Sequence, residues 1–558
     1  MKKYTYFILI LFALCLSLDM QAQPSWGKKA AKSVFVLKTF KADGSLNGSS
    51  NGFFVDSDGR AISSYAPFKG AAKAVVIDSE GKELPVTCML GANETYDVAK
   101  FRVETKKASP LLIASEATAV GAQVWLLPYR GVKTLKEGVV SKAEKFLTEY
   151  DYYTVTLQMQ EDMVGCPLLN AEGKVIGLMQ SPAKVNDTLN YAVSARYADS
   201  LRITGLSLND ASLRATQIKK DIPETLNQAV LMLYMGVSTL DSLSYSQLLN
   251  DFIVRFPSAP DGYQYRAQLA YNGNDFASAQ RDMETAIKVT DKRDDAHYVY
   301  SRMIYQKEVF KSRIPYEPWT FDLAMKEAVE AYNIEPLPIY KRQQALILFA
   351  QKKYEESSRL YDELMTSSLR SADIFYEASS CREMMGDTLG RLALLDSAMA
   401  MFSRPLLKDA APYLQARAQA RMNAEKYRDA VADWNDYEDL MKAQVNAQFY
   451  YLRFQAALGG RIYQQALNDI NRAIEMEPKN DLFYSEKASF LVRVGMYNEA
   501  IDTANQLIEV APNQSDGYLF LGLAQCLAGK KQEGILNLQK AQEMGDPQAV
   551  GLIEKYSR

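Results

Sequence analysis

Few side chains in this chain could carry out hydrolysis, and their positions do not suit that chemistry. The only histidine is His297, far from the strand-rich first 205 residues. Serine and cysteine nucleophiles need a neighbouring base, most often an imidazole, which takes a proton and later returns it to the leaving group. Asp97 and Cys166 lie in the first part of the chain without such a base. We therefore expect no nucleophilic hydrolysis from this region.

Other reactive arrangements are weaker. Cys166 is predicted to be a packed thiol, because a reactive cysteine needs a base or a strongly positive surrounding. It could pair with Cys88, although free buried thiols are expected for both. A serine–lysine arrangement that uses Ser63 or Ser64 stays open, but no residue pattern supports it. His297 has no histidine or cysteine cluster beside it, and nucleotide-binding glycine patterns are absent, so neither a metal nor a cofactor is expected.

The elements that must hold these residues are short strands. Up to Gly205, apolar or alternating runs are separated by turn-forming Gly, Asp and Asn residues. Many short strands at such spacing indicate a sandwich or a barrel. The predicted strands are 34–40, 52–55, 74–77, 86–90, 98–103, 123–127, 153–159, 174–179 and 189–193.

Three stretches of this region resemble the trypsin-like serine proteases of the HtrA type. Residues 50–66 resemble the family stretch that ends in T-N-N-H, and residues 96–101 resemble its D-L-A-V-L stretch. Residues 162–177 resemble G-N-S-G-G-P-L and the strand that follows it. The stretches keep the family's order and spacing. The resemblance implies an all-β trypsin-like double barrel for residues 23–205.

The resemblance also places the family's catalytic triad on this chain. Ala66 stands at the histidine position, Asp97 matches the aspartate, and Val164 stands at the position of the nucleophilic serine. Ala66 offers no base and Val164 no nucleophile, and Asp162 and Val164 replace the small or flexible residues of the oxyanion turn. We predict a degenerate, non-catalytic domain, a pseudo-protease. The alternative is an active serine endopeptidase that recruits substrates through the rest of the chain.

The second part of the chain, residues 222–558, has a helical pattern rich in alanine, leucine, tyrosine and charged residues. Compared with itself, it shows a 34-residue spacing, for instance between Tyr463 and Tyr497 and between Ala466 and Ala500. This register resembles the tetratricopeptide repeat, a helix–turn–helix unit. It implies an all-α superhelix of eight or nine units that ends in a short capping helix.

Residues at repeated positions are expected to hold these helices together. Small side chains let two helices approach closely, and tyrosines fill the space between them. The residues assigned to this role are Ala279, Tyr354, Tyr427, Ala430, Tyr463, Ala466, Tyr497 and Ala500. Stacked units present a concave face that binds peptides or protein segments. We therefore expect a protein-binding adaptor or scaffold, and a structural spacer is the second alternative.

The first 22 residues are typical of a secretory signal peptide. Lys2 and Lys3 precede an apolar run, and cleavage is predicted after Ala22. The run is shorter than the ~20 residues that span a bilayer, and no later stretch is apolar enough to do so. An exported, periplasmic protein that does not span the membrane is expected.

The charge of the chain bears on its partners. The formal net charge is -3, and no basic stripe interleaved with aromatic residues is present. Nucleic acid is therefore not an expected partner. The amino-acid composition changes from strand-rich to helix-rich after Gly205. Residues 206–221 are expected to form a linker or a short connecting helix between the two domains.

Overall fold

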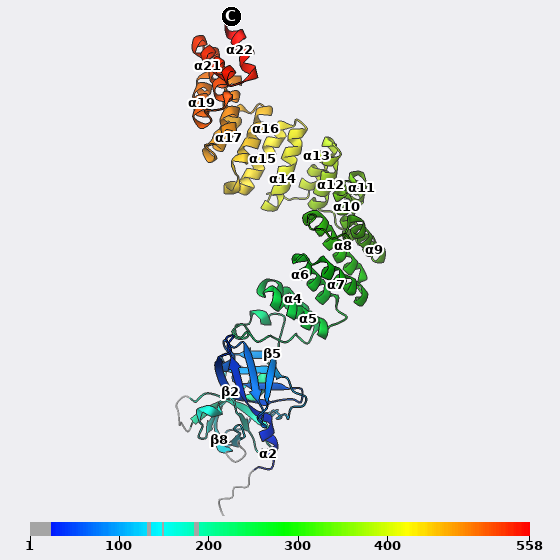
Figure 1. The fold of residues 1–558 in the computed structure, drawn as a ribbon, viewed down its shortest axis with the longest axis vertical. Helices are drawn as coiled ribbons and strands as arrows, with labels where there is room; N and C mark the ends of the chain where they lie inside the picture. Colours follow the sequence, from blue (N-terminus) through cyan, green and yellow to red (C-terminus); the bar gives the residue numbers. More distant parts are fainter. Residues whose placement is uncertain (1–23, 131–134, 148–149, 183–188, 558) are drawn as a thin grey trace, which may run out of the picture. The chain divides into compact units, whose positions relative to one another are not determined.

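The computed structural model describes residues 24–130, 135–147, 150–182 and 189–557, so the predicted signal peptide (1–22) lies outside the described residues. The chain forms two compact units, Met1–Asp291 and Lys292–Arg558. The first unit holds two β-barrels and the helices up to α7, and the second holds helices α8 to α22 (Figure 1).

Six antiparallel strands close the first barrel in the order β1-β2-β3-β6-β5-β4. Their bounds are β1 (Val34–Phe40), β2 (Leu46–Phe54), β3 (Arg60–Ser63), β4 (Lys73–Ile77), β5 (Glu83–Asn93) and β6 (Val98–Val103). The fully buried rings of Phe35, Phe68 and Phe101 pack together inside it. Burial of such large rings is the main stabilising contribution that a small barrel of this kind has.

The second barrel is closed in the order β10-β11-β12-β9-β8-β7. Its strands are β7 (Gln123–Leu126), β8 (Lys136–Lys145), β9 (Asp151–Thr156), β10 (Pro167–Leu169), β11 (Val175–Met179) and β12 (Leu189–Ser194). Val124, Tyr153 and Leu168 lie buried in its core. The predicted all-β double barrel is confirmed.

Each predicted run overlaps a strand, but the sequence did not predict β3, β8 or β10. β3 has four residues and β10 has three, too few to show a periodic pattern. β8 reads KEGVVSKAEK, and most of its residues are half-buried or exposed. Because many of its residues are charged, the sequence shows no strand pattern here, although β8 pairs with both β7 and β9.

The segment 206–221, expected to be a linker, is folded onto the first barrel. It contains the turn η6 (Ser207–Asn209) and the helix α3 (Ala211–Arg214). The N–H of Met89 in β5 donates to the carbonyl of Lys219 at 2.8 Å. The buried side chains of Leu213 and Ile218 join the core of the first barrel. Because leaving these apolar groups in water would cost free energy, the segment packs instead of remaining extended.

Helices make up the rest of the described chain as successive pairs, α4 with α5 up to α20 with α21, followed by α22. The bounds are α4 (Leu226–Thr239), α5 (Ser242–Arg255), α6 (Pro260–Asn272), α7 (Phe276–Val289), α8 (Arg293–Phe310), α9 (Phe321–Ile334), α10 (Pro338–Ala350), α11 (Tyr354–Leu364), α12 (Ala372–Met384), α13 (Thr388–Met399), α14 (Ala411–Asn423), α15 (Tyr427–Met441), α16 (Ala447–Gly459), α17 (Tyr463–Met476), α18 (Asp481–Arg493), α19 (Tyr497–Val510), α20 (Ser515–Leu527), α21 (Lys531–Glu543) and α22 (Pro547–Ser557). The expected helix–turn–helix units and the capping helix at the end are thus present.

Prolines punctuate these units as the sequence suggested. Pro478 and Pro512 follow the ends of α17 and α19, where the missing N–H and the ring prevent the helix from continuing. Among the helices that the structure describes, none is both long and apolar enough to cross a membrane.

Candidate functional site

The structure brings two of the three triad positions together. Ala66 follows β3, and Asp97 precedes β6, which pairs with β3. The N–H of Ala66 donates to Oδ1 of Asp97 at 2.7 Å, and the hydroxyl of Ser64 donates to Oδ2 at 2.5 Å. The aspartate carboxylate is therefore occupied by a backbone amide and a hydroxyl, where the family resemblance would place an imidazole.

The half-buried carboxyl of Asp97 is also electrostatically perturbed. Burial raises its pKa, while the hydrogen bonds from Ser64, Ala66 and Tyr65 act in the opposite direction. Its partners are neutral donors, so no positive charge compensates the carboxylate within this cluster. Such a group can fix the backbone of the turn at Ala66, but it has no imidazole to orient.

The third triad position, Val164, lies in a turn of the second barrel that is fixed to strand β2 of the first. The carbonyl of Val164 accepts hydrogen bonds from the N–H of Asn51 at 2.9 Å, its Nδ2 at 3.0 Å and the hydroxyl of Ser50 at 3.1 Å. Asn51 Nδ2 also donates to the carbonyl of Asp162 at 2.6 Å. Gly165 fits beneath this contact because a Cβ there would lie 2.2 Å from the Asn51 carbonyl oxygen. We call Ser50, Asn51 and residues 162–165 the turn clamp.

Three N–H groups of this turn donate to carbonyl groups of the protein. The N–H of Val164 donates to Glu161 O at 3.4 Å, that of Gly165 to Met179 O at 2.9 Å, and that of Cys166 to Met163 O at 3.2 Å. An oxyanion hole needs preorganised N–H groups that face the reacting oxygen. These three donors already have intramolecular acceptors and do not face a substrate.

The remaining candidate nucleophiles are tied into the structure as well. Cys166 is fully buried, and burial raises the pKa of its thiol. All four described cysteines, Cys88 among them, are free thiols. Ser63 donates to Asn51 O at 2.5 Å and Ser64 to Asp97. Within the described residues, neither hydroxyl is hydrogen-bonded to a lysine amine, so the serine–lysine arrangement is not formed.

The residues assigned to repeat packing occupy two environments. The alanines Ala279, Ala430, Ala466 and Ala500 are completely buried. The tyrosines Tyr354, Tyr427, Tyr463 and Tyr497 each begin the second helix of a pair and are only partly covered. Tyr463, for instance, is 45% exposed and its ring lies 6.2 Å from that of Phe490. The tyrosines therefore cover the edge of the helix contact, and the alanines form its centre.

Arginine–aspartate pairs, which were not predicted from the sequence, link the two helices of a repeat. Arg453 on α16 binds Asp469 on α17 through two hydrogen bonds, of 2.9 and 2.7 Å. The same two-pronged contact joins Arg417 to Asp433 and Arg266 to Asp282. In each pair the residues are 16 apart in the sequence. That constant spacing at the same repeat position was the available signal.

A cavity of about 360 Å³ lies between helices α8 and α10 of the second unit. Tyr298, Tyr305 and Phe310 form its aromatic part, and Phe310 is 77% exposed. The Arg302 guanidinium stacks on Tyr298 at 5.5 Å. Gln343, only 4% exposed, also lines the cavity, and its Nε2 has no hydrogen-bond partner among the described residues. This surface offers aromatic contact and an available buried donor.

Comparison with known proteins supports the assignment of the first domain. The family model of the trypsin-like peptidase domain matches residues 50–178, a range that includes Ala66, Asp97 and Val164. A protease from M. tuberculosis in its active form is 18% identical, with 32% of this chain and 82% of that chain covered and a TM-score of 0.28. An HtrA-type protease with a tripeptide is 17% identical, with 31% and 60% covered and a TM-score of 0.28.

The curated relatives are tetratricopeptide-repeat and heat shock proteins. Small glutamine-rich tetratricopeptide repeat-containing protein 2 of Mycosarcoma maydis is 32% identical over 111 residues, 20% of this chain and 30% of that protein. Heat shock protein STI1 of Saccharomyces cerevisiae is 29% identical over 101 residues, 18% and 17% of the two chains. The chain thus spans about a third or less of the length of these relatives. It combines a trypsin-like peptidase domain with tetratricopeptide-like helix pairs.

Proposed function

We propose that this protein is an exported, non-catalytic adaptor of the cell envelope, in which a degenerate trypsin-like domain is joined to protein-binding repeats. One observation carries the proposal: the Asp97 carboxylate is held by the Ala66 N–H and the Ser64 hydroxyl. No imidazole can stand in that position without a change of residue. The absence of a hydroxyl at Val164 and the hydrogen bond of its N–H to the carbonyl of Glu161 support the same conclusion.

The chemistry explains why these changes matter together. Acyl transfer requires a nucleophile, a base that accepts its proton, and donors that stabilise the developing oxyanion. The nearest hydroxyl to Asp97, that of Ser64, is buried and donates to the carboxylate instead of facing a cleft. The domain keeps the protease shape, and the residues that remain at the triad positions hold its backbone together.

Protein binding is assigned to the helical repeats. The relatives are repeat-containing and heat shock proteins by name, which supports a scaffold or chaperone-like role. The cavity between α8 and α10 supplies exposed aromatic surface at Phe310 and the amide donor of Gln343, which has no partner in the described part of the chain. Aromatic anchors with a nearby polar group are typical of protein contacts. The role of a simple spacer is less well supported, because a spacer needs no such surface.

Catalysis is tested with the purified mature chain, which starts at Gln23. We expect no casein hydrolysis and no labelling by a serine-directed fluorophosphonate. The double variant Ala66→His with Val164→Ser should stay almost inactive, because the N–H at position 164 already donates to the carbonyl of Glu161. Stoichiometric labelling of the unmodified chain that disappears on mutation of one serine would establish the serine endopeptidase instead.

Binding is tested by comparing two exposed apolar residues of the second unit. Phe310 lines the cavity, whereas Leu389, 69% exposed on α13, does not. Phe310→Asp should lose the proteins that the unmodified chain captures from a cell-envelope extract, and Leu389→Asp should retain them. Equal capture by both variants and the unmodified chain would contradict this assignment. Circular dichroism checks that both variants are folded.

A further inference from the structure

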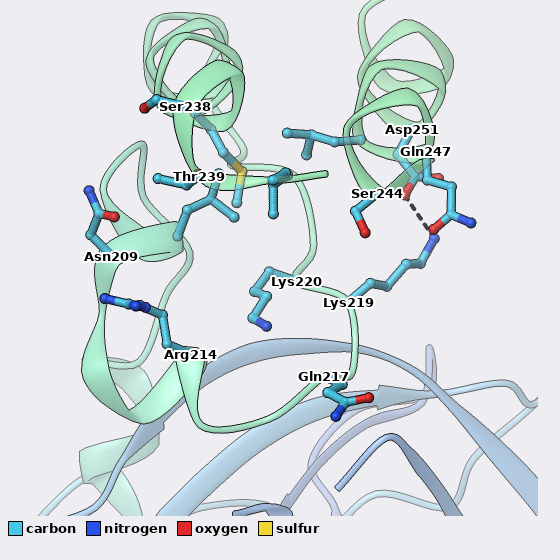
Figure 2. A pocket seen from close by; sticks show the side chains of 14 residues that line it. Asn209, Arg214, Gln217, Lys219, Lys220, Ser238, Thr239, Ser244, Gln247 and Asp251 are labelled. Atoms are coloured by element: carbon cyan, nitrogen blue, oxygen red, sulfur yellow. Dashed lines mark hydrogen bonds and ion pairs between the residues drawn. The ribbon is translucent and has the colours of Figure 1, made fainter. Parts of the chain in front are cut away.

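A second cavity, of about 540 Å³, lies within the first unit. One wall is the segment that follows the second barrel, including Arg214 and Lys220, and the other is formed by helices α4 and α5 (Figure 2). A cavity of this size is within the range that holds a small ligand.

The first wall is held firmly by the barrel. The N–H of Gln217 donates to Ala71 O at 2.8 Å, and the N–H of Asp221 donates to Met89 O at 2.9 Å. The hydroxyl of Thr216 adds a bond of 3.0 Å to Ala71 O. Because these contacts fix the backbone on both sides of Lys220, the charged groups of this wall are positioned before any ligand arrives.

The cavity lining contains three cationic side chains, Arg214, Lys219 and Lys220, and one acidic side chain, Asp251. Lys219 is paired with Asp251 at 2.8 Å. Lys220 lies between Arg214 and Lys219 in Figure 2, and its amine donates only to the carbonyl of Thr216, at 2.8 Å. Burial lowers the pKa of Lys220. Within the described residues, neither Lys220 nor Arg214 forms an ion pair. Both cations are available to an anion.

The second wall offers acceptors and apolar surface. The hydroxyl of Thr239 donates to Met235 O at 2.9 Å, and that of Ser244 donates to Asp241 at 2.7 Å. Since their protons are already used, these hydroxyl oxygens can only accept from a ligand. Met232 and Leu248 add buried apolar side chains to the lining. A ligand that suits both walls has an anionic end, N–H groups and an aliphatic part.

We propose that this cavity binds the C-terminal end of a peptide. The terminal carboxylate binds Arg214 and Lys220, backbone N–H groups donate to the hydroxyl oxygens of Thr239 and Ser244, and an aliphatic last side chain contacts the apolar lining. A free fatty acid has the first and last of these features but no N–H groups. The site is separate from the cavity between α8 and α10, to which the proposed function assigns protein binding. It lies between residues 208–220 and the helix pair α4 and α5.

The proposal is tested by titration calorimetry of the full chain with N-acetyl-Ala-Ala-Leu. The same peptide with a C-terminal amide tests whether the carboxylate is recognised. Octanoate, which has a carboxylate but no N–H groups, tests whether the peptide N–H groups are recognised. We expect the acid to bind, with the amide and octanoate each at least about tenfold weaker, because one charge-assisted hydrogen bond typically corresponds to tenfold or more in affinity. Arg214→Gln and Lys220→Met should each weaken binding of the acid by about tenfold, which a matched exposed control, Lys106→Met, should not do.

Several outcomes would overturn the proposal. Equal binding of acid and amide would show that the carboxylate is not recognised. Equal binding of octanoate would point to a site for carboxylic acids in general. Unchanged affinity in the double variant Arg214→Gln with Lys220→Met, or no heat with the acid at millimolar concentration, would show that this cavity is not the site. Unchanged melting curves establish that the variants are folded.

Discussion

Asp97 in the first barrel and Asp469 in the repeats are both shielded carboxylates, but their partners differ. Asp97 accepts hydrogen bonds from a hydroxyl and backbone amides. Asp469 accepts two hydrogen bonds from the guanidinium of Arg453, and the two side chains are 4% and 7% exposed. In the barrel the carboxylate of Asp97 fixes a turn of the backbone. In the repeats the carboxylate of Asp469 neutralises the buried guanidinium of Arg453 and so links two helices.

This difference shows how each region depends on its polar groups. A neutral residue in place of Asp97 leaves no buried charge behind, because the hydrogen-bond donors to Asp97 are neutral. Arg453 cannot be removed alone, because its loss leaves the carboxylate of Asp469 buried without a cation. In the barrel the carboxylate of Asp97 holds a backbone turn, whereas in the repeats the carboxylate of Asp469 neutralises a buried arginine.

The largest effect is expected for Arg453→Met. It should destabilise the repeats by about 3–5 kcal/mol, because Asp469 is left buried and unpaired. The double variant Arg453→Met with Asp469→Leu should recover most of that loss, since no buried charge remains. Urea unfolding followed by circular dichroism measures both. A double variant as unstable as the single one would show that packing, and not charge pairing, is what the arginine contributes.

A smaller effect is expected in the turn clamp. Gly165 and Gly44 have similar positive φ angles, +78° and +83°, but only at Gly165 would a Cβ meet a backbone atom, the Asn51 oxygen at 2.2 Å. Gly44→Ala should cost about 1–2 kcal/mol from backbone strain alone. Gly165→Ala should cost ~1–3 kcal/mol more from the steric clash. Equal melting temperatures for the two variants would mean that the turn is not held against β2.

The smallest effect is expected for Asp97→Asn, and it depends on pH. Burial raises the pKa of Asp97 above its ordinary value of 3.8. Between pH 3.8 and the raised pKa of Asp97 in the folded state, the folded state binds more protons than the unfolded state. The unmodified chain therefore loses stability as pH rises through this range. Asparagine does not titrate. The variant should therefore gain stability relative to the unmodified chain as thermal melts are moved upward in pH from 3.8.

A control with the opposite sign is available in the same barrel. Hydrogen bonds from Ser45 lower the pKa of the exposed Asp43 below 3.8. Its contribution to stability is present above 3.8 and is lost as pH falls through the lower value in the folded state. Asp43→Asn should lose stability relative to the unmodified chain as pH rises toward 3.8. The same trend in both variants would contradict the assignment for Asp97.

Much of the fold could be predicted from local patterns. The runs 34–40 and 98–103 coincide with strands β1 and β6, because alternating apolar residues mark one buried face of a strand. The 34-residue period likewise located α17 and α19. Strand β8 and the segment 206–221 could not be found in this way, because their charged and polar residues conceal a backbone that pairs or packs through distant partners.

The sequence alone determined which groups stand at the triad positions and how often the helical unit repeats, because both depend on residue identity and short-range order. Only the tertiary structure decided where the remaining polar groups bind. Asn51 and Val164 are 113 residues apart, and Arg214 lies opposite helices α4 and α5 only after residues 206–221 fold onto the barrel. Such contacts form when burial of apolar surface brings distant segments together, and no local pattern records them.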